Sequence, residues 1–149
     1  MGWPFIAIVS GGFDPIHVGH VRMIQEATRY GKLMIILNND NWLRQKKGFV
    51  FMKEDERREI LFAVKGVESV FLSLHEPDCY DDMSVCRELD LIRPDVFCNG
   101  GDRKEDNTPE KDLCERLGIV MMYNIGGDKI QSSSWLVEKA KGACRKVIE

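Results

Sequence analysis

The chain has 149 residues, of which 44% are hydrophobic and 30% are charged, and its formal net charge is −3. This composition is typical of a globular protein, and the length suffices for a real core, so we expect one domain over residues 1–149. The acidic balance, with no basic run longer than 44–47, argues against a surface that coats nucleic acid, and the apolar runs are too short to span a membrane.

The cysteines and the first residues indicate a cytoplasmic protein. Five cysteines with no C-x-x-C pair are typical of reduced thiols, not of a disulfide framework or a zinc site, and His75 near Cys79 is only a weak exception. Residues 1–4 carry no basic segment or cleavage site of a secretory signal. We therefore expect a cytoplasmic location.

The first apolar run leads into an unusual turn. Residues 5–9 are predicted to form a strand covered on both faces, and two glycines and a helix start follow over residues 10–20. A strand, a glycine turn and a helix start are typical of a phosphate site. His17 and His20 are three residues apart, so they project from one side of the first helical turn and can both donate to one phosphate. Their place directly after this turn favours a functional role over a role in capping and packing the helix.

The following apolar patterns alternate between helix and strand. A predicted helix over 18–30 ends at Gly31, and a strand over 33–37 follows. Residues 42–52 have neither period and are predicted to form a surface loop. The remaining elements are a helix over 54–64, a strand over 70–74, a helix over 83–92, a strand over 96–99, a helix over 108–117 with Thr108 as N-cap, a strand over 119–123 and a last helix over 132–146.

This alternation predicts an α/β fold. We expect a Rossmann-like, doubly wound, five-stranded parallel sheet in the order 3-2-1-4-5, with helices on both faces. Ligands of such sheets bind at the carboxyl ends of the strands, near the point where the strand order reverses. Three unusual turns follow strands, at 11–20, 99–103 and 131–134. We expect them to converge on one large nucleotide site.

The candidate residues before position 50 each have a structural and a functional explanation. Gly11 and Gly12 either make a turn or let backbone N–H groups approach a phosphate. Asp14 is either a helix cap or a group that orients a histidine or the acceptor. Lys46 and Lys47 belong either to a solvated loop or to a cover over the triphosphate, with Lys46 slightly preferred.

The two later turns supply further candidates. Ser132, Ser133 and Ser134 would cap a helix in any protein, but three hydroxyls and free N–H groups also make an anion cradle, to which Lys129 adds charge. Asp102 is either a turn residue or a ligand for acceptor hydroxyls or a metal. The other residues of that turn that we expect to bind the acceptor or the base are Asn99, Gly101 and Arg103.

Two other groups are expected at the surface. Arg57 and Arg58 begin a predicted helix, and Arg57 is the one able to reach a phosphate. Trp3 and the apolar run 49–51 are candidates for the interface of a homodimer.

Three segments resemble one known superfamily. Residues 11–20, which end in His17-Val18-Gly19-His20, resemble the H-x-G-H signature of the cytidylyltransferase-like nucleotidyltransferases. The serine run 132–134 resembles the second signature of that superfamily. Residues 93–97 with Gly100-Gly101-Asp102 resemble a segment of two branches, glycerol-3-phosphate cytidylyltransferase and the adenylyltransferase domain of bifunctional ADP-heptose synthesis enzymes. The resemblance covers nearly the whole chain in the right order.

The resemblance implies transfer of AMP or CMP from ATP or CTP to a phosphorylated small acceptor, with Mg²⁺ held mainly by the phosphates of the NTP. The acceptor phosphate would attack the α-phosphate in line and release pyrophosphate. From the composition, we expect neither nucleic acid nor a membrane as a partner. His17, His20 and Lys46 would be catalytic, each histidine donor lowering the barrier by about 3–4 kcal/mol, and Lys46 and Ser133 would hold the pyrophosphate. The nucleotide and its phosphates would contact Gly11, Gly12, Phe13, Asp14, Lys47, Lys129, Ser132, Ser133 and Ser134.

Two departures from the signatures bear on the substrate. Val137 stands where coenzyme adenylyltransferases have the arginine of I-S-S-T-x-I-R, and residues 124–131 lack the arginine of the glycerol-3-phosphate enzymes, with Lys129 as a candidate stand-in. The Gly100-Gly101-Asp102 sequence is closer to the heptose branch. We therefore expect a sugar-phosphate or polyol-phosphate acceptor, and ATP slightly before CTP. The alternatives are a coenzyme adenylyltransferase acting on nicotinamide mononucleotide or a flavin phosphate, and a non-catalytic nucleotide-binding module.

Overall fold

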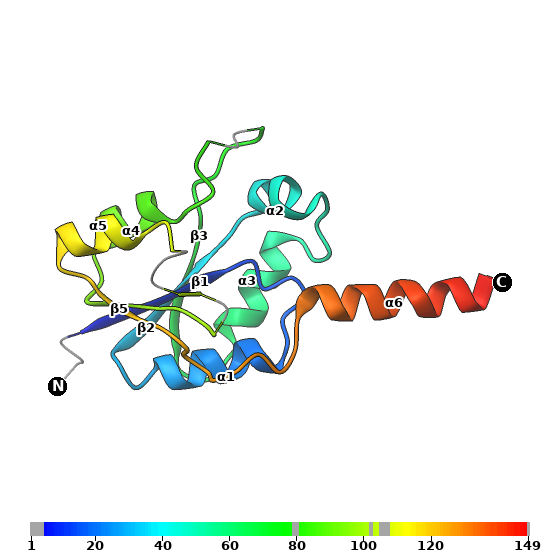
Figure 1. The fold of residues 1–149 in the computed structure, drawn as a ribbon, viewed down its shortest axis with the longest axis horizontal. Coiled ribbons are helices and arrows are strands. Elements are labelled where there is room, and N and C mark those ends of the chain that lie inside the picture. Colours follow the sequence, from blue (N-terminus) through cyan, green and yellow to red (C-terminus); the bar gives the residue numbers. More distant parts are fainter. Residues whose placement is uncertain (1–4, 79–80, 102, 105–107, 149) are drawn as a thin grey trace.

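The structure, a computed structural model, describes residues 5–78, 81–101, 103–104 and 108–148, with side chains up to residue 143. In these residues one sheet has five parallel strands in the order β3-β2-β1-β4-β5 (Figure 1). The strands are β1 (Ile6–Gly11), β2 (Lys32–Leu37), β3 (Val67–Leu72), β4 (Val96–Cys98) and β5 (Val120–Met122). The predicted fold class and strand order are therefore confirmed.

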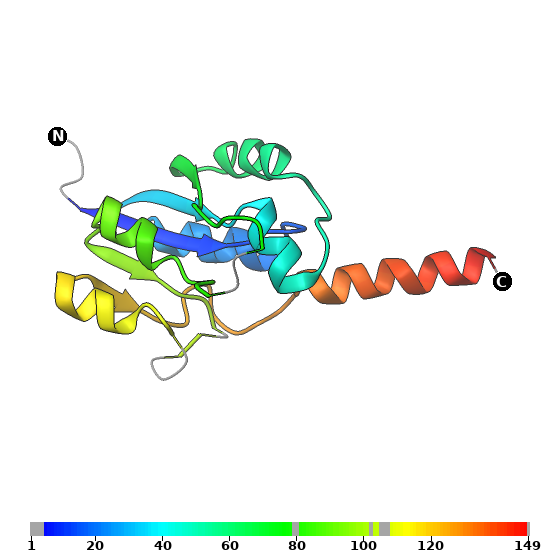
Figure 2. The ribbon, with the colours of Figure 1, turned by 90° about the horizontal axis from the view of Figure 1, so that it is seen from above.

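Helices cover both faces of the sheet, as predicted. In the described residues they are α1 (Val18–Ala27), α2 (Asp40–Lys47), α3 (Glu54–Phe62), α4 (Cys86–Ile92), α5 (Lys111–Leu117) and α6 (Ser133–Ile148). One face packs against α1 and α3 and the other against α4 and α5, whereas α6 projects away from the sheet (Figures 1 and 2). Among the described helices, none is both long and apolar enough to cross a bilayer.

The alternation of side chains along β1 explains the two layers. Ala7 and Val9 point into the cluster that includes Ile24 of α1 and Leu61 of α3. Ile8, between them, points into the opposite cluster with Leu89 of α4. Side chains of a strand alternate between the faces of its sheet, so a continuous apolar run fills two cores at once.

Several predicted boundaries shift by a few residues. The first helix ends at Ala27 instead of residue 30, β3 begins three residues earlier than predicted, and α4 begins three residues later. The prediction that Thr108 is an N-cap is wrong, because its hydroxyl donates to the carbonyl of Lys104 at 2.6 Å and α5 begins only at Lys111.

The prediction of a loop over 42–52 is wrong in its first half, where the chain forms α2. The side chain of Asn39 caps this helix by accepting a hydrogen bond from the Trp42 N–H at 2.9 Å. Gly48 ends it in the left-handed conformation, with φ 85°, and donates to the carbonyl of Arg44 at 2.9 Å. Leu43 is the buried residue of α2, and one such residue is too few to produce a helical period. Lys47 is therefore the last residue of a helix.

Candidate active site

A cavity of about 340 Å³ lies where the turns after β1, β4 and β5 come together. The structure thus brings the three expected turns around one space. The wall is formed by His17, Gly19, His20, Met23, Lys47, Gly100, Gly101 and residues 125–134.

The two histidines present their Nε2 atoms as donors. Their rings stack with centroids 3.8 Å apart. His17 is the N-cap of α1, and its Nδ1 accepts from the Gly19 N–H at 3.0 Å, while Nδ1 of His20 accepts from the His17 N–H at 3.2 Å. A ring nitrogen that accepts carries no proton, so the proton of each neutral ring is on Nε2.

The surroundings keep both rings neutral. Burial, assisted by His17 and then Lys47, lowers the pKa of His20 to about 3. Burial, Lys129 and Lys47, in that order, also lower the pKa of His17. The pair can therefore donate hydrogen bonds to an anion without itself being positively charged.

Glycines and Phe13 shape the turn that holds the histidines. A Cβ on Gly19 would lie 2.9 Å from Cε1 of His17 and would push that ring away. A Cβ on Gly12 would lie 3.0 Å from Leu43 of α2, and one on Gly11 would lie 3.2 Å from the ring of Phe13. Phe13 in turn packs on His20, with ring centroids 4.7 Å apart. Gly11, Gly12 and Phe13 are absent from the cavity wall as described, and of the three it is Phe13 that packs on a histidine.

Two lysines line the cavity. Lys47, in the last turn of α2, forms part of its wall, and the neighbouring Lys46 does not. Burial lowers the pKa of Lys47, with Asp14 opposing this shift and Arg57 adding to it. Lys129 reaches the wall from the other side, and its ammonium lies 5.0 Å from the centre of the Trp135 ring.

The three serines of the last turn differ in what they offer a ligand. The hydroxyl of Ser133 donates to the carbonyl of Pro15 at 2.8 Å, which ties α6 to the first turn. The hydroxyls of Ser132 and Ser134 share one hydrogen bond of 2.7 Å, so the proton of one of them stays available. An anion in the cavity would meet that hydroxyl and the N–H groups that begin α6.

The turn after β4 is partly engaged with the protein itself. The side-chain amide of buried Asn99 donates to the carbonyl of Met122 at 3.3 Å, which joins the ends of β4 and β5. Arg103 lies 3.5 Å from the buried carboxylate of Glu110. Gly101 lines the cavity, and Asp102 lies outside the described residues.

Of the loop 125–131, which supplies a large part of the wall, sequence reasoning singled out Lys129 and the turn that begins at residue 131, but it assigned no role to residues 125–128 and 130. The N–H of Gly126 donates to the carboxylate of Glu26 at 2.6 Å, so the loop is fastened to α1 next to Met23. The signal was present in the sequence, because Gly126-Gly127 follows a strand just as Gly11-Gly12 does.

Comparison with known proteins decides the family. The model of the cytidylyltransferase-like family matches residues 8–135. The chain belongs to this family. The resemblance to cytidylyltransferase-like nucleotidyltransferases that the sequence motifs suggested is thereby confirmed.

Relatives of this cytidylyltransferase-like chain include two kinds of curated protein. The bifunctional protein HldE of Syntrophotalea carbinolica is 34% identical over 116 residues, which are 76% of this chain and 22% of that protein. The chain thus spans about a fifth of the length of the HldE relatives. The FAD synthase of Aciduliprofundum boonei is 30% identical over 113 residues, 75% of this chain and 71% of that protein. A lipopolysaccharide core biosynthesis protein of Thermoplasma volcanium, 24% identical, shares the fold with a TM-score of 0.65 over 82% of this chain and 94% of that one.

The donor set of the cavity fits a metal that arrives with phosphates. Among the described residues, no three His, Cys, Asp or Glu side chains lie close enough together to hold an ion. Both carboxylate oxygens of Asp14 are used by backbone N–H groups, and Asp128 is the carboxylate on the described wall. Mg²⁺ commonly binds through one or two carboxylates together with substrate phosphates.

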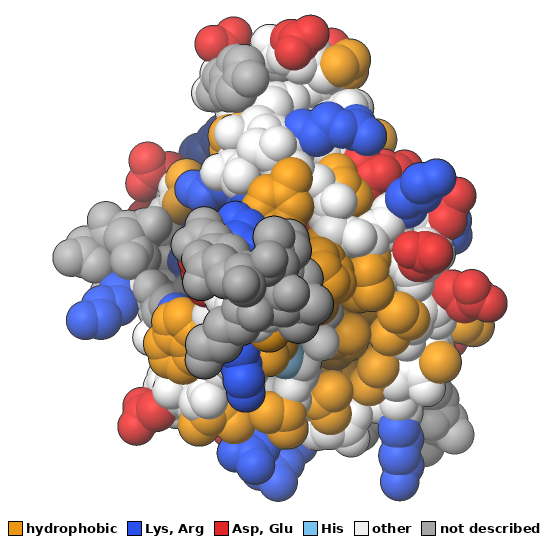
Figure 3. All heavy atoms as spheres, turned by 90° about the vertical axis from the view of Figure 1, so that its right-hand side faces the viewer, with side chains coloured by type: hydrophobic (Ala, Val, Ile, Leu, Met, Phe, Trp, Pro, Cys, Tyr) orange, Lys and Arg blue, Asp and Glu red, His pale blue; other side chains and the backbone are white. Residues whose placement is uncertain are grey.

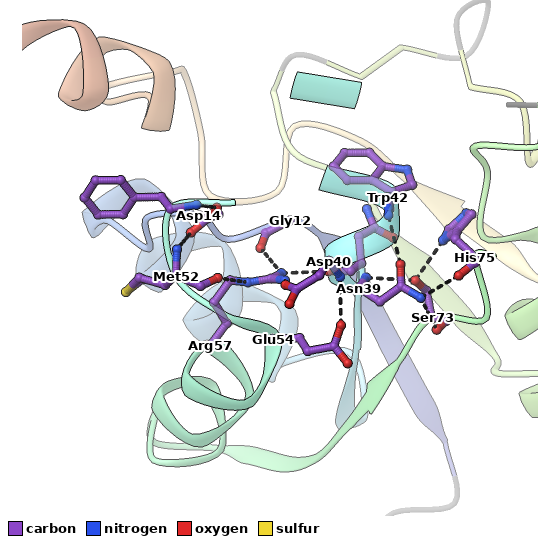
Figure 4. Close-up of polar contacts among 12 residues, drawn as sticks. Gly12, Asp14, Asn39, Asp40, Trp42, Met52, Glu54, Arg57, Ser73 and His75 are labelled. Atoms are coloured by element: carbon purple, nitrogen blue, oxygen red, sulfur yellow. Dashed lines mark hydrogen bonds and ion pairs between the residues drawn. The ribbon is translucent and has the colours of Figure 1, made fainter. Parts of the chain in front are cut away.

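A buried network corrects what the sequence alone suggested for two charged residues near the site (Figure 4). Asp14 is 2% exposed and accepts from the N–H groups of Phe51 and Met52, while the N-cap of α1 is His17 and not Asp14. Arg57, expected at the surface, is 1% exposed, because carbonyls of the surrounding loops and Asp40 accept all its hydrogen bonds. Arg58 is exposed, as expected.

Proposed function

We propose that the chain transfers AMP from ATP to a phosphorylated small acceptor, a sugar or polyol phosphate, and releases pyrophosphate. The observation that carries this proposal is the cavity itself, in which two Nε2–H donors, two lysines and the first turn of α6 surround one space. Membership of the cytidylyltransferase-like family supports the reaction class.

The reaction is a displacement at phosphorus. An oxygen of the acceptor phosphate forms a bond to the α-phosphorus, and the bond from that phosphorus to the bridging oxygen breaks, so pyrophosphate leaves with the electron pair. Negative charge grows on the oxygens of the α-phosphate in the transition state, and the Nε2–H groups of His17 and His20 donate to them. Donors already in place lower such a barrier by about 3–4 kcal/mol each.

The outgoing phosphates need positive charge and donors of their own. Lys47 and Lys129 line the cavity, and Ser132 or Ser134 has a free hydroxyl proton. The catalytic role expected for Lys46 passes in this proposal to Lys47, whose helix places it on the wall. Mg²⁺ would arrive with the triphosphate, and its chemistry there is to neutralise phosphate charge.

Two relatives bear on the acceptor. The match to HldE proteins supports a sugar-phosphate acceptor, in agreement with the Gly100-Gly101-Asp102 sequence. The match to FAD synthase over 71% of that protein favours a second candidate, in which FMN receives the adenylyl group. In both cases the nucleotide would be ATP.

The test is a matrix of nucleotides and acceptors. The protein is incubated with Mg²⁺, with ATP or CTP, and with a heptose phosphate, glycerol 3-phosphate or FMN, and pyrophosphate release is measured. We expect release with ATP and a sugar or polyol phosphate. Release with ATP and FMN but with no other acceptor would support the second candidate. No release with any pair would refute the proposed enzymatic activity.

Alanine variants of the histidines then test the site. His17→Ala and His20→Ala should each lower kcat by about 10²- to 10³-fold, because each removes one donor to the transition state. Thermal unfolding of both variants checks that the fold persists. Lys139→Ala, at an exposed position of α6 outside the cavity wall, is the control and should keep the wild-type rate.

A further inference from the structure

One buried arginine joins the three segments that precede and follow α2. Nη1 of Arg57 donates to the carbonyl of Gly12 at 2.8 Å and to that of Asn38 at 2.6 Å. Its Nε donates to the carbonyl of Met52 at 2.8 Å. These carbonyls belong to the glycine turn, to the end of β2 and to the loop after α2, so one guanidinium fixes their relative positions (Figure 4).

The same arginine also grips the beginning of α2. Its Nη2 lies 2.6 Å from the carboxylate of Asp40, the first residue of that helix. The Asp40 N–H donates to Glu54 at 2.9 Å, so α3, which carries Arg57, holds the start of α2 by two bonds. A charged hydrogen bond inside the protein is stronger than a neutral one, and it is also more costly to break.

The loop that follows α2 is fastened to the histidine turn by a second carboxylate. Asp14 accepts from the N–H of Phe51 at 2.7 Å and from that of Met52 at 2.6 Å. Asp14 lies three residues before His17, and Phe51 lies four residues after Lys47. Arg57 therefore holds the start of α2, and Asp14 and Arg57 hold the loop that follows it, while the last residue of α2 lines the cavity.

We propose that Arg57 is a positioning residue of the reaction: together with Asp14 it sets Lys47 against the His17–His20 pair. This inference rests on the proposed function for its kinetic part only. Arg57 is absent from the described cavity wall, so its effect on the reaction is indirect, and we assign it to Lys47. A small misplacement of a catalytic group can cost about a hundredfold in rate. The hydrogen bonds of Asp14 and Arg57 to the segments around α2, here called the clamp, should therefore affect the rate.

Lysine in place of Arg57 is the informative substitution. It keeps the charge but has no planar fork, so it cannot serve the carbonyls and Asp40 together. Arg58→Lys is the matched control, because it makes the same change at the neighbouring, exposed position of α3. Asp14→Asn is a milder second variant, since an amide oxygen can replace only one of the two carboxylate acceptors.

Hydrogen exchange tests the clamp without any substrate. In Arg57→Lys, and less strongly in Asp14→Asn, we expect faster exchange over residues 40–53 and unchanged exchange in α1 and α4. Arg58→Lys should exchange like the wild type. Unchanged exchange over 40–53 in both clamp variants would overturn the inference, whether or not the proposed reaction exists.

Kinetics test whether the clamp acts through Lys47. We expect Arg57→Lys to lower kcat about 10- to 100-fold with little change in the KM for ATP. When Lys47 is already alanine, the same substitution should cost less than about threefold, because the group that it positions is gone. An equal loss in both backgrounds would overturn the role through Lys47. If the wild type transfers no nucleotide, the proposed function fails and the exchange experiment alone decides on the clamp.

Discussion

Both histidines are fixed in orientation, and both are kept neutral. Each ring is held by a hydrogen bond that uses Nδ1 as acceptor, and each is kept neutral by burial and nearby positive charge. A neutral donor is available at every pH above its pKa. The cost is stability at low pH, because folding then excludes a proton that the unfolded chain would bind.

This cost gives a prediction for His20. Its pKa is 6.5 in the unfolded reference and about 3 in the folded protein. Below pH 6.5 the unfolded chain gains a proton that the folded chain lacks, so the free energy of unfolding falls as the pH drops towards 4, by up to about 1.4 kcal/mol per pH unit. We expect His20→Asn to show a smaller slope in urea unfolding between about pH 7 and pH 4. The asparagine oxygen can still accept from the His17 N–H, and equal slopes would contradict the prediction.

The sequence was enough to predict the histidine pair from its motif, but it did not predict the hydrogen-bond partners of the charged side chains. The spacing of His17 and His20 predicted two donors on one side of a helix start, and both line the cavity. Arg57 was expected at the surface because its acceptors are carbonyls 19 and 45 residues away, which no local pattern marks. For Asp14, likewise, the donors are 37 and 38 residues away.

At the scale of elements, apolar period found the strands and the helices that pack on the sheet. It missed α2, in which Leu43 is the buried residue and whose contacts include the Asn39 cap and the bond from Arg57 to Asp40. The signals that mark α2 in the sequence are the cap residue Asn39, the basic last turn and Gly48. A prediction based on caps would have placed Lys47 in a helix.

The contribution of Gly48 to the end of α2 can be tested by one substitution. Its control is a second glycine-to-alanine change, which should not lower the free energy of unfolding. Gly48 has φ 85° and nothing within 4 Å of an added Cβ, so Gly48→Ala adds backbone strain without a clash. We expect a loss of about 1 kcal/mol in urea unfolding. Gly142→Ala, inside α6 and also free of neighbours within 4 Å, should leave stability unchanged or raise it by up to about 1 kcal/mol. Equal losses in the two variants would contradict this explanation.

At the scale of the whole molecule, the surface has an apolar patch in addition to the cavity. Hydrophobic side chains gather on the side towards which α6 points (Figure 3). Phe49 is 39% and Phe51 is 53% exposed, as the interface expected from the sequence requires, and Trp3 lies outside the described residues. A homodimer through these aromatic residues stays a prediction.

The cavity joins segments from both halves of the sheet, so a nucleotide bound there should stabilise the whole fold. A ligand that binds only the folded state at a hundred times its Kd adds about 2.7 kcal/mol, which corresponds to a Tm increase of roughly 5–10 °C for a chain of this size. With Mg²⁺ present, we expect this increase with ATP and a smaller one with CTP at the same concentration, measured by thermal unfolding.

Variants locate the source of that increase. Lys47→Ala and Lys129→Ala should each reduce the effect of ATP, because both ammonium groups line the cavity and would meet the phosphates. Lys139→Ala, exposed on α6, should leave it intact. A shift that survives in both cavity variants would place the nucleotide elsewhere on the molecule, and a larger shift with CTP would reverse the preferred base while keeping the site.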